Sequence, residues 1–259
     1  MISRSARVLL MGWLFQFKQM SRSSFDSLLA VLWPLFFATV AFFMFRAGGK
    51  PDALVYASLG SAVMGIWTAT SVAAGSALQR ERWYGTLELL VAAPTHFSLV
   101  LLPVGLATAT VGTYCMASTL LWGRLVFGIR LTIEHPVLFG LAIPATLLSI
   151  GALGFLMAVS FARYRNSWSL GATMEYPVWL ICGFLVPLAL LPAEVRPISW
   201  ALAPTWGMRA IRHAAQGGGS PLLDIGMCVA LGAAYVALGV VLTEAVLRAA
   251  RARASLSLT

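Results

Sequence analysis

The sequence predicts an all-α membrane protein built from six transmembrane helices. Of its 259 residues, 59% are hydrophobic and only 10% are charged, whereas soluble domains carry about 25% charged residues. A single soluble core does not grow enough at this length to hold the excess of apolar side chains. We therefore expect lipid to cover much of the apolar surface.

Six apolar stretches are long enough to cross a bilayer, which needs about 20 residues per helix. They cover residues 25–45, 53–78, 97–122, 136–162, 168–191 and 222–247, and each is bounded by Arg, Lys, Glu, Gly or Pro. These stretches define a transmembrane domain over residues 25–251, followed by a tail over residues 252–259.

Residues 1–24 form a different kind of element. Only ten uncharged residues separate Arg7 from Lys18, which is about 15 Å of helix and too short to cross the bilayer. Within residues 3–22 most of the larger apolar side chains fall on one arc of a helical wheel, and Met11 and Phe15 lie outside it. The arc contains Leu9, Trp13, Leu14, Phe17 and Met20. The pattern predicts an amphipathic helix that lies in the headgroup plane.

The basic residues predict the orientation. With both termini in the cytoplasm, the inner segments carry eleven Lys or Arg residues and the outer segments carry seven. This excess favours cytoplasmic termini. The net charge of +9 is scattered between apolar stretches, so it suits anionic lipid headgroups and does not form a nucleic-acid-binding face. The preference for Arg over Lys, together with many Ala and Gly residues, indicates a GC-rich genome. We expect the protein to lie in the cell membrane of a bacterium.

The loop over residues 79–95 reads QRERWYGTLELLVAAPT and follows the second predicted span on its cytoplasmic side. The consecutive charges at 80–82 end that span, and Gly85 permits a turn. Thr86 can cap a short helix, and Glu88 lies in its first turn, where the helix dipole favours an anion. Pro94 then stops the helix. By itself this pattern also fits an ordinary interfacial hairpin between two spans.

This loop resembles the coupling segment of type-2 ABC exporter permeases, the membrane subunits of drug, antibiotic and lipid exporters of the daunorubicin-exporter kind. The resemblance extends along the chain to the Pro-rich stretch over residues 187–212, which is similar to the external re-entrant helices of that family. It implies docking of a separate ATPase and a conduit between two permease copies. The residues that it assigns to coupling are Arg80, Glu81, Arg82, Gly85, Thr86, Glu88, Leu90 and Pro94.

The chain cannot supply the ATPase itself. A phosphate-binding loop needs a Gly-rich turn that ends in Gly-Lys-Ser/Thr. The two lysines do not fit, because Lys18 follows Phe17 and Lys50 precedes Pro51. We therefore expect no cofactor in this chain, with ATP and Mg²⁺ bound by the partner ATPase, and no enzymatic activity. Nor is a metal site expected, because the three cysteines lie apart within apolar stretches.

Glu175 is the main charge inside a predicted span, and such charges are functional candidates by default. In a functional role it lines a conduit that attracts a cationic substrate, or it bonds between helices. In a structural role its carboxyl is buried against an Arg or an amide of a neighbouring helix, or it reaches the inner interface. The remaining conduit candidates are hydroxyl or helix-distorting residues: Ser61, Thr68, Tyr176 and Pro177. Two other carboxylates have structural interpretations, since Glu244 is spaced to pair with Arg248 and Asp224 lies at the start of the last span.

Other classes of protein remain as alternatives. An intramembrane enzyme needs convergent catalytic groups inside the spans, but all three histidines fall in loops. A secondary transporter would show inverted repeats or matched broken helices, and none is visible. A non-transporting assembly or scaffold subunit of an ABC complex would share the docking segment. Within the exporter interpretation, the substrate is amphipathic or hydrophobic: a drug, an antibiotic, a peptide or a lipid.

Overall fold

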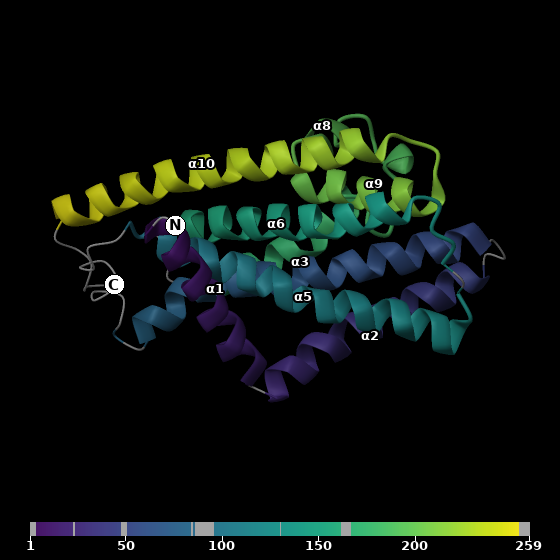
Figure 1. The fold of residues 1–259 in the computed structure, drawn as a ribbon, viewed down its shortest axis with the longest axis horizontal. Helices are drawn as coiled ribbons and strands as arrows, with labels where there is room; N and C mark the ends of the chain where they lie inside the picture. The colour runs from purple at the N-terminus through teal and green to yellow at the C-terminus, as the bar shows by residue number, and fades with distance from the viewer. Residues whose placement is uncertain are drawn as a thin grey trace.

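The computed structural model describes residues 4–22, 24–47, 51–83, 85, 96–129, 131–161 and 167–253. These residues form α-helices and one short 3₁₀-helix, and they contain no strand, which confirms the all-helical class. The longest helices are α3 (Pro51–Trp83), α5 (Ser98–Phe127), α6 (Pro136–Phe161) and α10 (Pro221–Arg253). They run side by side along the long axis of the molecule (Figure 1).

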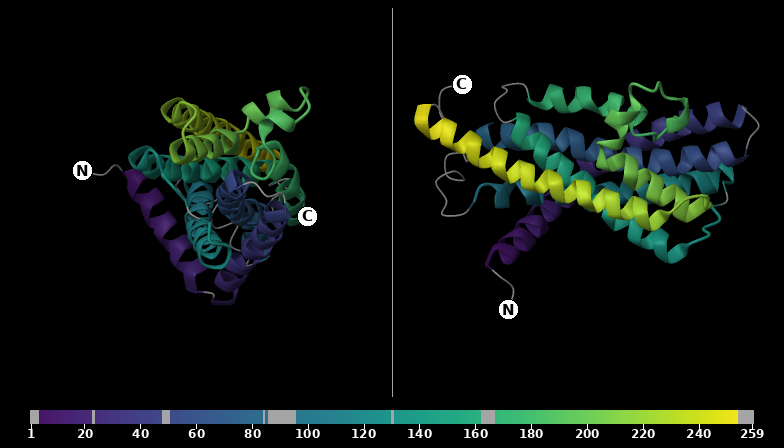
Figure 2. Two further views of the ribbon diagram at one scale, coloured as in Figure 1. Left: turned by 90° about the vertical axis from the view of Figure 1, so that its right-hand side faces the viewer. Right: turned by 90° about the horizontal axis from the view of Figure 1, so that it is seen from above.

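Helix α3 lies at the centre of the bundle. It packs against α2 (Ser24–Ala47), α5, α6, α7 (Ser167–Ile181) and α9 (Ala203–Gln216). Its side chains Ile66 and Trp67 are almost completely buried in a cluster that also contains Ile150 of α6 and Met208 of α9. In contrast, α10 covers one side of the bundle through α6 and α9, and most of its apolar surface is exposed. The views along and across the bundle show this outer position (Figure 2).

Four helices in the described part of the chain are both long and apolar enough to cross a membrane. Their apolar stretches are Ala53–Ala74, Ser98–Phe127, Pro136–Phe161 and Pro221–Val246, and they coincide with four of the six predicted spans. Helix α2 is continuous over the first predicted span, although its described side chains give only a shorter apolar stretch, Leu35–Arg46. The count of six spans therefore stays a prediction.

Helix α7 differs from the predicted fifth span because it ends at Ile181, ten residues before the predicted end at Leu191. Its 15 residues extend about 22 Å, less than the hydrocarbon thickness of about 30 Å. Gly183 ends the helix with a φ of +75°. The amide of Gly183 donates to the carbonyl of Leu180, and the amide of Phe184 donates to that of Trp179. This is a Schellman arrangement, which glycine favours because the left-handed conformation costs it little.

The segment after α7 contains three short elements, the 3₁₀-helix η1 (Leu188–Leu190), α8 (Arg196–Trp200) and α9. Helices α8 and α9 lie near the start of α10, at the end of the bundle opposite to the one where α10 finishes (Figure 1). The prediction places this end outside the cell. Whether these elements enter the bilayer as re-entrant helices stays a prediction.

Helix α1 (Arg4–Arg22) crosses the bundle obliquely (Figure 2). The indole of Trp13 donates a hydrogen bond of 3.1 Å to the Thr110 hydroxyl of α5, and Phe17 stacks on Tyr114 of the same helix. The predicted apolar arc is the partly buried side of α1, while Met11 and Phe15 are exposed. Its position in the headgroup plane stays a prediction.

Candidate functional site

The seam between α3 and α7 contains the carboxylate of Glu175, whose side chain is only 5% exposed. The hydroxyl of Thr68 on α3 donates to Glu175 Oε1 at 2.8 Å. This is the interhelical bond that one interpretation of the sequence expected. Among the described residues, no Lys, Arg or His forms an ion pair with this carboxylate. The predicted site therefore brings Thr68 and Glu175 together without a basic partner.

Aromatic side chains surround this part of α7. Trp179 lies one helical turn after Glu175 and on the same face. The Trp179 ring meets the rings of Tyr176 and of Phe37 on α2 edge to face, with centroids 5.0 and 5.2 Å apart. Tyr176 is 51% exposed, so it faces away from the seam. Pro177 lies within α7, which continues past it to Ile181.

Ser61 lies on the same face of α3 as Thr68, two turns earlier. Its hydroxyl is buried and has no hydrogen-bond partner among the described residues. The structure therefore brings only two of the five predicted conduit residues together, Thr68 and Glu175 in the seam. Ser61 is buried farther along α3, and Tyr176 and Pro177 lie on the exposed side of α7.

The predicted coupling residues begin at the end of α3. The helix continues five residues past the predicted end of the second span and includes Arg80, Glu81 and Arg82 in its last turn. Gly85 is exposed and has a φ of +67°, in agreement with the turn expected there. Thr86, Glu88, Leu90 and Pro94 lie outside the described residues.

The end of α7 is held by Arg212 of α9, whose importance sequence reasoning missed. Its guanidinium donates to the carbonyls of Gly183 and Phe184 at 2.6 and 2.8 Å. It also lies over the ring of Tyr56 on α3, with its Cζ 3.2 Å from the ring centroid. The Tyr56 hydroxyl donates to the Gly183 carbonyl at 2.9 Å. Burial lowers the pKa of Arg212 to about 10, so the guanidinium stays charged at neutral pH and suits the negative end of the α7 dipole.

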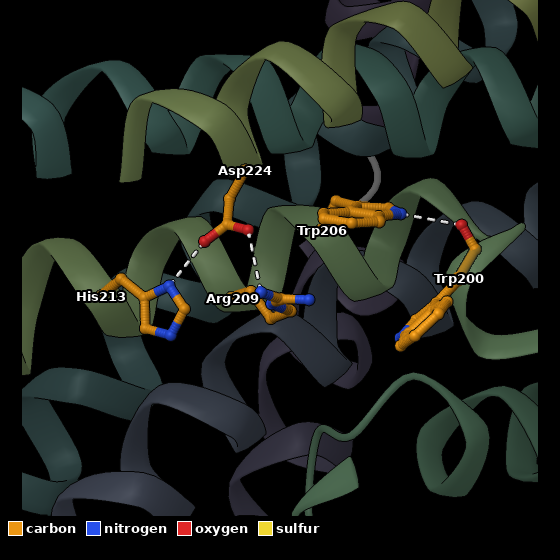
Figure 3. A network of polar contacts seen from close by, with 5 residues as sticks. All are labelled: Trp200, Trp206, Arg209, His213 and Asp224. Atoms are coloured by element: carbon orange, nitrogen blue, oxygen red, sulfur yellow. Dashed lines mark hydrogen bonds and ion pairs between the residues drawn. The ribbon is translucent and has the colours of Figure 1, made fainter. Parts of the chain in front are cut away.

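A second polar network joins α9 to the start of α10 (Figure 3). Asp224, in the first turn of α10, is 1% exposed and bonds to His213 Nδ1 at 2.5 Å. Its other oxygen lies 3.4 Å from the guanidinium of Arg209. That guanidinium also lies over the ring of Trp206, whose indole donates to the carbonyl of Trp200. The network connects α8, α9 and α10 at one end of the bundle.

Replacing Asp224 with asparagine should therefore destabilise the joint between α9 and α10. The variant keeps the shape but removes the charge that bonds to His213 and faces Arg209. We expect the free energy of unfolding to fall by about 1.5–3 kcal/mol, as for other hydrogen bonds to charged groups. Thermal unfolding of the purified protein in detergent would measure the change. Glu244→Gln, at an exposed position of the same helix, is the control, and an equal loss in both variants would contradict this role.

The predicted pair of Glu244 and Arg248 is not an ion pair. The Nε of Arg248 donates to the backbone carbonyl of Glu244 at 3.3 Å, and no side-chain ion pair joins the two within the described residues. The guanidinium therefore bonds to a backbone carbonyl of its own helix and not to the Glu244 carboxylate.

The long apolar helices define a multi-pass membrane protein. The chain matches the ABC-2 type transporter family over residues 8–215 and belongs to that family. This confirms the resemblance to type-2 ABC permeases, which are membrane transport subunits that work with an ABC ATPase. A search among curated proteins gave no match to the chain.

Proposed function

We propose that this chain is the permease subunit of an ATP-driven exporter and that it couples to a separate ABC ATPase. Two copies, of this chain or of this chain and a related one, would form a conduit for an amphipathic or hydrophobic compound. ATP and Mg²⁺ would bind to the ATPase. The complex would lie in the cell membrane of a bacterium, in contact with its lipids and with both termini in the cytoplasm.

The continuity of α3 is the observation that carries this proposal. The helix has 33 residues, which extend about 50 Å and exceed the thickness of the hydrocarbon core. It runs without a break from Tyr56, through Thr68, to the charged residues 80–82. A helix is rigid over this length, so motion of the docking segment would reach the seam beside Glu175.

The coupling segment is tested by the double variant Gly85→Pro and Glu88→Ala. Proline fixes φ near about −65°, whereas Gly85 has a φ of +67°, so the turn must change. Glu88→Ala removes the acidic residue expected to contact the ATPase. We expect the ratio of transport to ATP hydrolysis to fall about 5- to 150-fold, the usual range of coupling between sites. Transport and phosphate release by the reconstituted complex would measure this ratio.

The control is Glu244→Ala, which removes an exposed charge outside the coupling segment. It should leave coupling unchanged, and all variants should insert into membranes normally. Wild-type transport by the double variant would contradict the docking assignment. A wild-type chain that binds the ATPase but transports nothing across a broad substrate set would instead favour the scaffold alternative.

A further inference from the structure

Glu175 is a buried carboxylate that lacks a counter-charge in the described part of the chain. The only other buried acid there is Asp224, and it has both His213 and Arg209 as partners. Glu175 instead accepts one hydrogen bond from the neutral hydroxyl of Thr68. An ionised carboxylate has about four acceptor sites, so this bond leaves most of its capacity unused.

A second polar group in the same place also lacks a partner. Trp179 follows Glu175 by one turn on the same face of α7. Its side chain is 6% exposed, and its indole N–H has no hydrogen-bond acceptor among the described residues. The Glu175 carboxylate, which has no cationic partner there, and the Trp179 indole N–H, which has no acceptor, therefore lie one turn apart. Buried polar groups are normally paired, so two such groups together point to a ligand that supplies both partners.

The seam lies at the edge of the bundle, where a ligand can approach it. Thr68, Ala69 and Val72 on α3 are partly exposed, unlike the fully buried residues before them. On α7, Met174 and Tyr176 flank Glu175 in sequence and are 41% and 51% exposed. The α3 side of the seam therefore offers the methyl groups of Thr68, Ala69 and Val72 to an apolar body.

The same surroundings favour a cation over a neutral group. Aromatic rings attract ammonium groups through their negative faces, and the Trp179 ring, which meets Phe37 edge to face, lies one turn after Glu175 on the same face of α7. A carboxylate with a neutral hydroxyl partner carries an uncompensated charge in an apolar bundle, which is costly. A ligand that brings a positive charge would remove that cost, whereas an anionic ligand would add to it.

We propose that Glu175 recognises the positive charge of a cationic amphiphile, such as a protonated amine on an apolar or aromatic body. The Trp179 indole would donate to an oxygen acceptor near that amine. The inference rests on the proposed function, because it places the site on the path of the exported compound. In a purely structural role, by contrast, Glu175 would only accept the hydrogen bond from Thr68 and would bind no ligand.

The test uses three fluorescent probes that share a diphenylhexatriene body: the trimethylammonium derivative, the uncharged parent and the propionate. Binding to the purified chain in uncharged detergent is measured first, without the ATPase. The wild type should bind the ammonium probe most tightly. Glu175→Gln keeps the shape of the side chain and can still accept from Thr68. It should weaken binding of the ammonium probe by roughly tenfold or more, as expected when one member of a buried charge pair is neutralised.

Two controls separate charge from structure. Glu175→Asp keeps the charge and should keep the preference for the ammonium probe, while Glu244→Gln should behave as wild type. Equal weakening of all three probes by Glu175→Gln, or unchanged binding of the ammonium probe, would overturn the inference. A wild type that binds the uncharged probe as tightly as the ammonium probe would also overturn it, even if no variant folds.

Transport by the complete complex in phosphatidylcholine vesicles then separates this inference from the proposed function. ATP-driven movement of all three probes with equal preference would keep the exporter and reject the cation site. Selective binding of the ammonium probe, without ATP-driven movement of any probe, would keep the cation site and count against the exporter.

Discussion

Replacing Gly60 of α3 with alanine is expected to destabilise the protein strongly. A Cβ atom at this position would lie 1.7 Å from the carbonyl oxygen of Phe184. That oxygen also accepts a hydrogen bond from Arg212, so the turn after α7 and the guanidinium would have to move together. We expect a loss of about 3 kcal/mol or more, at the upper end of the range for overpacking.

Thermal unfolding in detergent would show this loss as a fall of about 6–12 °C in Tm for a chain of this size. Gly140→Ala and Gly226→Ala are matched controls, because both positions are helical and have no atom within 4 Å of the added methyl group. These controls should be neutral or slightly stabilising, since alanine favours helix over glycine. A Gly60→Ala variant as stable as these controls would show that α3 does not approach the turn so closely.

Replacing Arg212 with methionine is expected to release the end of α7. The substitution keeps an unbranched side chain but removes both bonds to the carbonyls of Gly183 and Phe184. Tyr56 would still donate to Gly183, whereas the Phe184 carbonyl would lose the donor that Arg212 provides. At about 1.5–3 kcal/mol for a bond to a charged group, we expect the free energy of unfolding to fall by about 2–4 kcal/mol.

Arg196→Met provides a demanding control for this prediction. Arg196 also donates to two backbone carbonyls, those of Ala189 and Leu191, but it is exposed. Water can replace its bonds, so its loss should change stability by less than about 0.5 kcal/mol. Arg212→Lys should fall between wild type and Arg212→Met, because an ammonium group lacks the planar fork that reaches two carbonyls at once. Equal losses at positions 196 and 212 would contradict the special role of the buried guanidinium.

The helices could be predicted from the sequence because their signals are local. The apolar stretches and their polar boundaries located α2, α3, α5, α6 and α10 to within a few residues, apart from the extensions of α3, α5 and α10 beyond the predicted spans. Helix α7 ended early because Gly183 and the hydrogen bonds around it stop a helix inside an apolar stretch. The glycine was visible in the sequence, but apolar length alone does not show where a helix ends.

The partners of the site could be predicted only in part. Glu175 stood out as a charge in an apolar stretch, yet its bond to Thr68 spans 107 positions of the chain. Arg212 lies in a predicted outer segment, and nothing in the neighbouring sequence shows that it contacts Tyr56, which is 156 positions away. Contacts of this kind depend on how helices pack. The predicted coupling residues from Thr86 to Pro94 lie outside the described residues and stay a prediction.

Helix α7 is bonded to α3 at two places: Glu175, in the middle of α7, accepts from Thr68, and Gly183, in the turn just after its end, accepts from Tyr56. Any tilt or slide of α3 as one body must disturb both bonds within the same movement. If α3 moves during transport as proposed, the middle of α7 and the turn that follows it would therefore shift together.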